Sequence, residues 1–448
     1  MKKKILFTII LLFSVTSMSF YYVVDKGYDR QNKYILFIKK IIPNELSKNI
    51  RDIIFIIPNL KNKNQVLNLQ VKKYEQGLEG NLFREQNIKS KNKKNFNIKE
   101  FFLPFKRLDL NLGWAATENS KRAHYLEIIN DKVIVISGLG QTIYFSKKNI
   151  YNEKLHQKNI KNNILSYLKK RNYKLIGIRD LFIEDNFVYI SLQHKDLNGF
   201  TINIYRAKLN FEKLNFEPFF ITNEYWQNYN VFSGGRIETY KDNQILFSIG
   251  YSSIKSAAQD KKSLLGKIIS IDKSTAAHNL VSVGHRNPQG LFYEKSSNII
   301  MNSEHGPKGG DEINFNYQNT KELANFGWDI ASYGQPYHGK DIFKKSHKKY
   351  GFVEPFKNYT PSIGISEIFY LPEEKNFNQL GNNLFVTSLR AASIYIIEIN
   401  KKFTQIINED RIFFKEQRIR DIEFDNDEGV FLILFEKTPS IGVLSTKD

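Results

Sequence analysis

From about residue 100 onward, apolar and polar positions alternate in short runs separated by turn residues, which is the pattern of β-strands. The runs form a repeated unit: a strand, a polar turn, and a more apolar strand that ends in a small or polar residue. The copies begin at His124, Asp180, Arg236, Gly290, Ser366 and Asp421. A further strand is expected after most copies, at Thr142–Phe145, Ile202–Leu209, Lys267–Asp272, Ser393–Ile399 and Ile441–Leu444. Repeats of roughly 50 residues with several strands each are typical of propeller blades, so the sequence predicts an all-β, six-bladed β-propeller over residues 100–448.

The interval between the fourth and fifth copies is longer than the others. It should hold an insertion that rises over one face of the propeller. A β-sandwich is the structural alternative, but six nearly equal repeats are hard to place in one. Helix is scarce, and the best candidate is a loop helix at Ile160–Lys170.

The N-terminus has the pattern of an export signal. A lysine-rich start, Met1–Lys4, precedes an uncharged run, Ile5–Val24, which is about long enough to span a bilayer as a helix. No Ala-x-Ala cleavage site follows, so residues 1–24 are expected to be a membrane anchor or a signal peptide. Either places the rest of the chain outside the cytoplasm, in the periplasm, and an anchor would hold it at the inner membrane. Residues 25–99 are rich in Lys and Asn and end near the charged stretch Lys89–Lys94. We interpret them as a stalk or wrapping extension with little core of its own.

Composition narrows the classes of function. The 448 residues include no Cys, which excludes disulfides, thiol catalysis and cysteine zinc sites. Lys and Arg number 66 against 46 Asp and Glu, a formal net charge of +20. Such a charge suits an acidic ligand, an anionic membrane surface or nucleic acid. The lysines are scattered rather than arranged in a stripe, and no compact nucleic-acid motif stands out. We therefore interpret most of the charge as a compositional habit and expect no nucleic-acid partner.

Three polar islands interrupt the apolar runs between the fourth and fifth copies. They are Gly284–Leu291, Ser303–Asn314 and Asn325–Gln335, and they concentrate Gly, Pro, charged and amide residues. Turn residues bend the backbone sharply and leave its polar groups free to face a ligand. Loops on a rigid scaffold are the usual place for a site, so these islands are the candidate site.

The islands closely resemble those of the soluble glucose and aldose sugar dehydrogenases, the glucose/sorbosone dehydrogenase-like propellers. The resemblance is carried by Gly-His-Arg-Asn-Pro-Gln-Gly-Leu and Glu-His-Gly-Pro-Lys-Gly-Gly-Asp-Glu-Ile-Asn, and it covers roughly residues 230–440. Members of that family are six-bladed propellers that use pyrroloquinoline quinone (PQQ) with calcium. The resemblance implies an aldose substrate, oxidation of its anomeric hydroxyl to a lactone, and an external electron acceptor. PQQ carries three carboxylates and a quinone, so it requires fixed guanidinium groups and a hard cation held by oxygen ligands.

The resemblance also implies which residues bind the cofactor. Arg286 and Asn287 match cofactor-contacting positions, and Gln289 lies beside them. Arg418 and Arg420 match a pair of arginines that bind the carboxylates. Because they alternate along a predicted strand, they face the same side.

Calcium and the quinone have their own expected partners. By resemblance, the main-chain carbonyls of Gly306 and Pro307 match the calcium ligands. Arg390 stands where the family usually has a lysine on the quinone. Arginine keeps the charge there but changes the geometry of the contact.

Several of these residues have a structural interpretation as well. Asp311 and Glu312 could tie down their own loop, and we favour that role over a direct ligand role. His285 fits a buried structural histidine as well as a site residue, and Trp328 fits a packing role in the core or at the rim. The spacing of the two arginines at 418 and 420 would also suit a solvated strand edge.

The departure from the family concerns catalysis. The family's base is a histidine that opens a His-x-Gly/Ser-Gly-Arg sequence, and here that sequence is Phe232-Ser233-Gly234-Gly235-Arg236. An aspartate that orients the base is replaced as well, by Tyr251 in Ile249-Gly250-Tyr251. Phenylalanine cannot accept a proton, and a general base contributes roughly 10²–10⁴-fold to a rate.

Three hypotheses follow from this departure. The chain is an enzyme whose base has moved to His305 or Tyr251, or a propeller that binds PQQ or a sugar without turning it over. In the third hypothesis it is an extracytoplasmic interaction module with no cofactor. The retained arginines argue against the third hypothesis, and the missing base pair argues against the first.

Overall fold

In the computed structural model, the described part of the chain is residues 82–105 and 123–446, except 153–154, 229–231, 255, 321, 338–342, 374–376, 378–379, 416 and 438. The expected signal segment, Ile5–Val24, lies outside the described residues, as does residues 25–81 of the expected extension. No helix within the described ranges has the length and apolar character needed to cross a bilayer.

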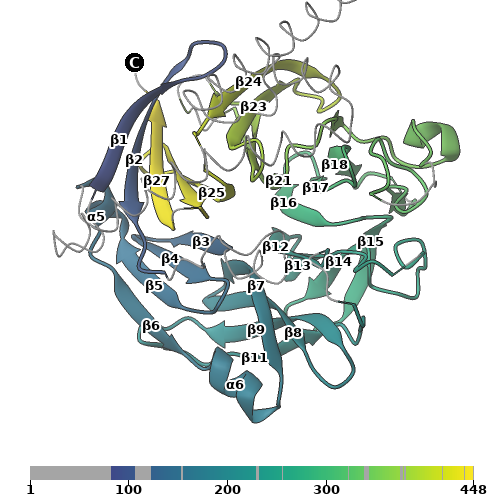
Figure 1. The fold of residues 1–448 in the computed structure, drawn as a ribbon, viewed down its shortest axis with the longest axis horizontal. Helices are drawn as coiled ribbons and strands as arrows, with labels where there is room; N and C mark the ends of the chain where they lie inside the picture. Colours follow the sequence, from purple (N-terminus) through teal and green to yellow (C-terminus); the bar gives the residue numbers. More distant parts are fainter. Residues whose placement is uncertain are drawn as a thin grey trace, which may run out of the picture.

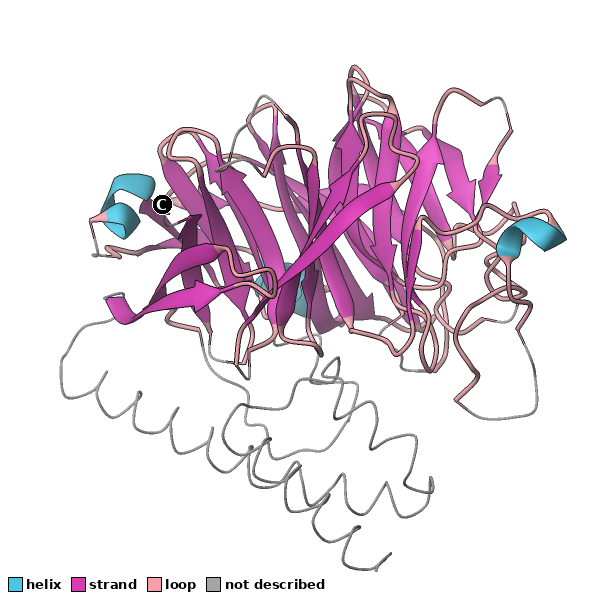
Figure 2. Ribbon diagram, turned by 90° about the horizontal axis from the view of Figure 1, so that it is seen from above, coloured by secondary structure: helices cyan, strands magenta, loops and turns pink. Residues whose placement is uncertain are grey.

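Six mainly antiparallel sheets are arranged in a ring (Figure 1). Seen edge-on, their strands run between the two faces of the ring (Figure 2). Neighbouring inner strands contact each other all the way round, from β3 through β7, β12, β16, β21 and β25 back to β3. The fold is therefore the six-bladed propeller that the repeats predict.

The strands have the following bounds, taken from the channel outwards. The inner strands are β3 (His124–Ile129), β7 (Lys174–Glu184), β12 (Gly234–Tyr240), β16 (Pro288–Glu294), β21 (Ile365–Leu371) and β25 (Ile419–Asp425). The second strands are β4 (Lys132–Ser137), β8 (Phe187–Lys195), β13 (Gln244–Ile249), β17 (Ile299–Glu304), β22 (Asn383–Ser388) and β26 (Val430–Phe435). The third strands are β5 (Thr142–Ser146), β9 (Phe200–Lys208), β14 (Lys267–Asp272), β18 (Asp311–Tyr317), β23 (Ser393–Ile399) and β27 (Ser440–Thr446). The outer strands are β6 (Lys158–Asn162), β11 (Glu217–Ile221), β15 (His278–Val283), β20 (Lys357–Tyr359), β24 (Ile406–Phe413) and β2 (Asn95–Phe102).

Short elements complete the blades. Three strands lie at the outer edges: β1 (Leu82–Lys89), β10 (Lys213–Leu214) and β19 (Ala324–Asn325). The helices are α5 (Lys147–Tyr151), α6 (Ile164–Lys170) and the 3₁₀ helix η2 (His347–Tyr350). The helix expected at Ile160–Lys170 therefore begins only at Ile164, because Ile160 is buried and pairs in β6 with Thr142 of β5.

One sheet joins the two ends of the described chain. Its strand order is β1–β2–β27–β26–β25, so residues 82–102 pair with the C-terminal strands. Residues 82–99, which were expected to belong to the extension, therefore lie in a sheet of the propeller. The charged stretch Lys89–Lys94 connects β1 to β2, whose inward-facing Phe96 and Ile98 are fully buried. This pairing closes the ring between sequence-distant segments.

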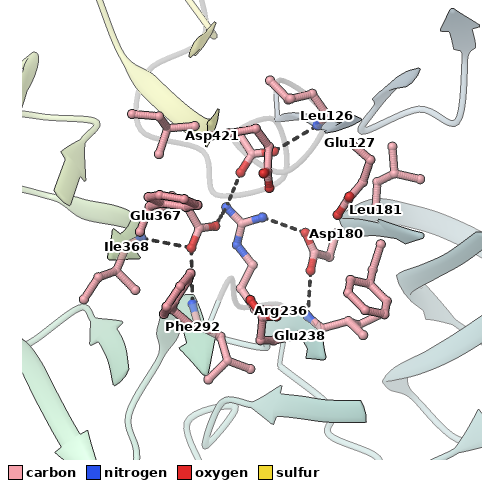
Figure 3. A pocket seen from close by; sticks show the side chains of 16 residues that line it. Leu126, Glu127, Asp180, Leu181, Arg236, Glu238, Phe292, Glu367, Ile368 and Asp421 are labelled. Carbon is pink, nitrogen blue, oxygen red and sulfur yellow. Dashed lines mark hydrogen bonds and ion pairs between the residues drawn. The ribbon is translucent and has the colours of Figure 1, made fainter. Parts of the chain in front are cut away.

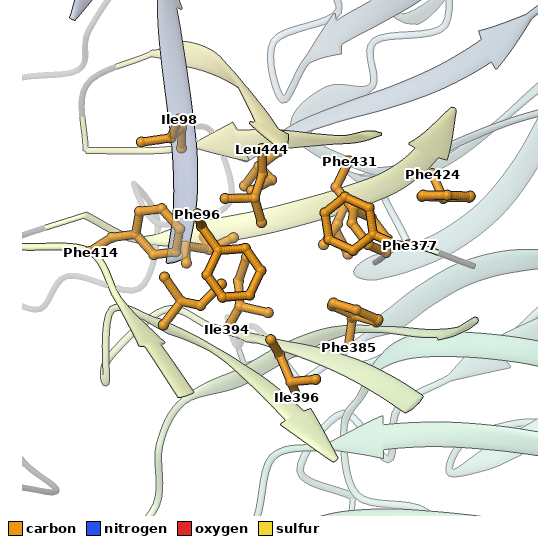
Figure 4. Packing of buried hydrophobic residues seen from close by; sticks show 14 of the residues in the cluster. Phe96, Ile98, Phe377, Phe385, Ile394, Ile396, Phe414, Phe424, Phe431 and Leu444 are labelled. Atoms are coloured by element: carbon orange, nitrogen blue, oxygen red, sulfur yellow. The ribbon is translucent and has the colours of Figure 1, made fainter. Parts of the chain in front are cut away.

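Apolar side chains fill the space between adjacent blades. The largest cluster packs Phe96, Ile98 and Phe431 of one sheet against Phe385 of the neighbouring sheet and Phe377 of the loop before β22 (Figure 4). The rings of Phe385 and Phe431 lie 4.3 Å apart between centroids. Burial of these side chains is the main stabilising term, and it fixes each blade against the next.

The long interval between the fourth and fifth copies holds more regular structure than expected. Asp311–Asn314, which the sequence placed in a polar island, opens β18 and pairs with β17. Beyond it, β19 pairs in parallel with β15 of the preceding blade. The start of β18 could not be predicted from the alternation of apolar and polar residues, because Asp311, Glu312 and Asn314 are hydrophilic and nevertheless buried.

Candidate functional site

The candidate site lies where the inner strands begin. β-Bulges interrupt the pairing there, for example between Gly234 and Ile237, between Pro288 and Gly290, and between Ile419 and Asp421. Bulges re-aim side chains and are common beside functional sites. Five of the predicted cofactor residues lie at these strand starts or in the segments just before them: Arg286, Asn287, Gln289, Arg418 and Arg420.

Arg418 and Arg420 share one carboxylate. The Nε atoms of Arg418 and Arg420 donate to the two oxygens of Glu436, at 2.9 and 2.6 Å. Although burial alone would raise it, these two guanidinium groups lower the pKa of Glu436 to about 2. Arg420 also donates through Nη1 to Oε1 of Gln289 at 3.0 Å. Both side chains therefore point to the same carboxylate, although Arg418 precedes β25 and a bulge lies between Ile419 and Asp421.

Asn287 connects Arg418 and Arg420 to main-chain groups of other blades, at Gly234 and His305. Its Oδ1 accepts from Nε2 of Gln289 and from the main-chain N–H of Gly234, both at 3.2 Å. Its carbonyl accepts from the main-chain N–H of His305 at 3.1 Å. A continuous set of hydrogen bonds thus runs from Arg420 to the loop that contains the expected calcium ligands.

Arg286 is buried beside this set of bonds, with 4% of its surface exposed. Its Nη1 donates to the carbonyl of His305 at 2.8 Å, and burial lowers its pKa. Its Nε is buried, and among the described residues it has no hydrogen-bond partner. The guanidinium carbon lies 4.4 Å from the ring centroid of Phe232 and 5.2 Å from that of Trp328. Trp328 therefore packs, as expected, but it packs against a predicted site residue.

The loop with the expected calcium ligands is tied down by Asp311. Oδ1 of Asp311 accepts from the N–H of Gly306 at 3.1 Å, and Oδ2 accepts from Gly364 and Ile365 at 2.7 and 3.1 Å. A Cβ on Gly306 would lie 1.9 Å from the carbonyl oxygen of Gly310, so only glycine permits this turn. The favoured structural role of Asp311 is thus what the geometry shows.

Three further residues named from the sequence are Arg390, Glu312 and His285. Arg390 is exposed in the turn between β22 and β23, and its main-chain N–H donates to Ile363 at 3.1 Å. Glu312 is buried on β18, and burial raises its pKa well above the usual value. His285 is fully buried, with Nε2 2.7 Å from Oγ of Ser282, which is the geometry of a structural histidine.

At the position of the family's base, the aromatic ring of Phe232 faces that of Tyr251. Their centroids are 5.9 Å apart and their planes differ by 23°. His305, the other expected substitute, has Nδ1 3.9 Å from Oδ1 of Asp311, and its side chain is 23% exposed. Of the two substitutes, only His305 combines exposure with a neighbouring carboxylate.

The sequence did not single out the ionic group in the channel (Figure 3). Arg236 donates through Nη1 to Asp180 at 2.6 Å and through Nη2 to Asp421 at 2.9 Å, and it also pairs with Glu367. These carboxylates accept main-chain N–H groups of the neighbouring inner strands, for example Ile237 onto Asp180 at 2.6 Å. The sequence does contain a signal for this ionic group, because in several copies of the repeat a charged residue begins an inner strand that is otherwise apolar.

Beside this ionic group the channel widens into a cavity of about 200 Å³. Its lining includes three further carboxylates, from Glu127, Glu238 and Glu423. Burial raises the pKa of each of them well above the usual value. Six carboxyl side chains and a single guanidinium group, that of Arg236, therefore line this cavity.

No group of three or more metal-ligating side chains occurs within the described ranges. A cation at this site would therefore rest on main-chain carbonyls such as those of Gly306 and Pro307. Hard oxygen donors of this kind suit calcium.

A six-bladed propeller with clustered arginines over glycine-rich loops defines the sugar dehydrogenase class of propellers. The Glucose / Sorbosone dehydrogenase family model matches residues 176–441, and the chain belongs to that family. An uncharacterised protein of Synechocystis is 28% identical over 282 residues, which are 58% of this chain and 66% of that protein. The aldose sugar dehydrogenase YliI of Escherichia coli is 27% identical over 230 residues, which are 48% of this chain and 60% of that protein. The matches thus span two thirds or less of these relatives.

Solved structures share the fold. The soluble aldose sugar dehydrogenase of Escherichia coli in the apo form superposes with a TM-score of 0.57 at 20% identity, covering 72% of this chain and 96% of that one. The PQQ-bound aldose sugar dehydrogenase of Streptomyces coelicolor gives a TM-score of 0.55 at 17% identity, covering 78% and 98%. These similarities support the propeller architecture independently of the sequence motifs.

Proposed function

We propose that this protein binds PQQ together with calcium and oxidises the anomeric hydroxyl of an aldose to a lactone, slowly, for an external electron acceptor. The observation that carries the proposal is the hydrogen-bonded set at the strand starts. It gathers Arg418 and Arg420 on Glu436 and connects them through Gln289 and Asn287 to the loop of the expected calcium ligands.

The residues present suit such a cofactor. The guanidinium groups of Arg418 and Arg420 would hold its carboxylates, and Arg390 would lie on the quinone side. The buried Nε of Arg286 has a hydrogen still to donate, and an anionic oxygen would satisfy it. The carbonyls of Gly306 and Pro307 would hold calcium.

Bound PQQ would supply the hydride acceptor, while the protein must hold the sugar and take its hydroxyl proton. His305 is the candidate acceptor, with the proton received at its imidazole. Asp311, 3.9 Å away, would stabilise the resulting imidazolium. Its placement differs from that of the family's base, and slow turnover follows from that difference.

A second candidate function is a propeller that binds its ligand without oxidising it. The contact between Phe232 and Tyr251 favours it, because two packed rings occupy the positions of the family's base and of its orienting residue. For both candidates we propose an extracytoplasmic location, in the periplasm or at the inner membrane. The basic start and apolar run of Met1–Val24 support that proposal.

A double substitution separates the two candidates. Phe232→His with Tyr251→Asp should raise PQQ-dependent dye reduction with aldoses by roughly 10²–10⁴-fold, because it restores a general base and its partner. The matched control is Phe232→Gln with Tyr251→Asn, which places similar polar groups without a base at either position. In the slow enzyme, His305→Gln abolishes the activity of the otherwise unmodified protein. Activity that appears only in the restored variant would identify the natural protein as a non-catalytic binder, and fast turnover of the unmodified protein would contradict both candidates.

A further inference from the structure

We propose that Phe232, Tyr251 and Trp328 form an aromatic clamp that positions the guanidinium of Arg286 for the anionic groups of the cofactor. The inference rests on the proposed function, since it concerns the same ligand. It gives a role to the two positions at which this chain departs from its family. We call these three residues the aromatic clamp below.

Three rings surround one cation. The guanidinium carbon of Arg286 lies 4.4 Å from the ring centroid of Phe232, 5.2 Å from that of Trp328 and 6.0 Å from that of Tyr251. The rings also contact each other, with Tyr251 and Trp328 meeting edge to face at 5.2 Å. Arginine is attracted to aromatic faces within about 6 Å, and the attraction grows when the pair is shielded from water. All three rings can therefore hold the guanidinium in place.

The main chain fixes the clamp to the loop of Arg286. The N–H of Tyr251 donates to the carbonyl of Arg286 itself at 3.0 Å, and the N–H of Trp328 donates to that of Gly284 at 3.0 Å. The N–H of Ser252 donates to the carbonyl of Phe232 at 3.1 Å. The three rings and the arginine consequently move as one unit.

Gly250 permits the close approach of Phe232. A Cβ on Gly250 would lie 2.1 Å from the carbonyl oxygen of Phe232, so any other residue would push the two segments apart. The segment of Gly250 and Tyr251, which matches the family's segment with the orienting aspartate, is thus packed directly on the segment of Phe232. This geometry places both replaced residues against Arg286.

The replacement changes what competes for Arg286. An aspartate at position 251 would offer the guanidinium a carboxylate of the protein's own, whereas Tyr251 offers a ring. Aromatic faces stabilise the cation without using its N–H donors. Nη1 donates to the carbonyl of His305, and Nε has no hydrogen-bond partner among the described residues. The clamp therefore orients Arg286 and leaves donors for a ligand.

Arginine-specific dicarbonyl modification tests the clamp without any cofactor. Phenylglyoxal is applied to the full-length protein, and the rates at individual arginines are read by peptide mapping. Arg286 should react much more slowly than Arg418, whose side chain is 31% exposed. Phe232→Leu and Trp328→Leu should each speed the reaction of Arg286 about tenfold, and Phe232→Tyr should restore the slow rate.

A second arginine supplies the matched control. Arg206 lies 4.7 and 4.6 Å from the ring centroids of Phe187 and Phe219 at another blade. Phe219→Leu should speed the reaction of Arg206 and leave Arg286 unchanged. An unchanged rate at Arg286 in both Phe232→Leu and Trp328→Leu would overturn the clamp.

PQQ affinity, measured with calcium by absorbance titration, tests the positioning role. Phe232→Leu should weaken binding about tenfold, Phe232→Tyr should retain it, and Phe219→Leu should have no effect. Faster modification of Arg286 with unchanged PQQ affinity would overturn the positioning role. If the unmodified protein binds no PQQ while Arg286 still responds to Phe232→Leu, the clamp stands and the proposed function fails.

Discussion

At the scale of single residues, Glu436 organises the positive side of the site. It is 4% exposed and accepts one hydrogen bond from each of the two arginines expected to bind the cofactor. Removing one member of a buried, hydrogen-bonded ion pair leaves the remaining charges without compensation. Glu436 therefore contributes both to stability and to the orientation of the arginines.

Glu436→Gln should destabilise the protein by about 3 kcal/mol and weaken PQQ binding, because the arginines lose the carboxylate that aligns them. Denaturant unfolding at neutral pH measures the first effect. Glu373→Gln is the control: Glu373 pairs with Lys401 on the surface and is 61% exposed, so its loss should leave the free energy of unfolding nearly unchanged. Equal effects of the two substitutions would contradict the role given to Glu436.

Asp180 predicts a pH dependence. Burial raises its pKa to about 7, although Arg236 opposes the shift. A carboxyl group whose pKa is higher in the folded state stabilises the fold below its unfolded pKa, and that contribution is lost as the pH rises towards 7. The free energy of unfolding of the unmodified protein should thus fall more steeply between pH 4 and 7 than that of Asp180→Asn. Parallel curves from denaturant unfolding across this range would contradict the assignment.

Residue patterns revealed one half of the site. Arg418 and Arg420 are two residues apart in a stretch that reads as a strand, so their shared direction could be predicted, although β25 begins only at Ile419 and has a bulge before Asp421. Their partner Glu436 could not, because it follows an apolar strand and meets them only through the pairing of β25 with β26. The contacts of Phe232 with Arg286 likewise depend on tertiary structure, since they join loops of two different blades.

At the scale of elements, the ring is closed by pairing between β2 and β27. Phe96 on β2 is fully buried and packs against Phe377, with ring centroids 6.5 Å apart. The sheet of β25–β27 would present an unpaired edge without residues 82–102. Closure of this kind links the stability of the ring to an N-terminal segment.

Phe96→Ala should lower the free energy of unfolding by about 3–5 kcal/mol, because it removes a buried ring and leaves a cavity. Denaturant unfolding followed by tryptophan fluorescence measures the change. Ile407→Ala is the control on the neighbouring strand β24: Ile407 is 61% exposed, so its loss should stay within about 0.5 kcal/mol. A small effect of Phe96→Ala would show that β2 is not needed for closure.

The strands that could be predicted from the sequence are those whose apolar positions repeat. All six copies of the two-strand unit are present, with β14 and β23 at the predicted bounds. β1 and β2 could not be predicted as strands of the propeller, because their many Lys and Asn residues obscure the few apolar positions that are buried. β18 could not be predicted as a strand, because several of its buried residues are polar. They are satisfied by hydrogen bonds, such as the one that Asn314 donates to Glu304.

At the scale of the whole molecule, the ring separates two electrostatic environments. Arg286, Arg418 and Arg420 lie at or just before the strand starts, whereas the lining of the channel cavity includes six carboxyl side chains and one cation, Arg236. Clustered guanidinium groups favour a polyanionic ligand and can raise its rate of association. The scattered surface lysines that give the net charge of +20 do not reveal this separation.

The most direct test of the account is the melting temperature of the purified protein with PQQ and calcium in large excess. A ligand that binds only the native state stabilises it by about 2.7 kcal/mol at a hundred times its Kd, so the melting temperature should rise by several degrees. The rise should disappear when Arg418 and Arg420 are both replaced by alanine, and also when a chelator replaces calcium. An unchanged melting temperature in PQQ with calcium would contradict the claim that these guanidinium groups form a cofactor site.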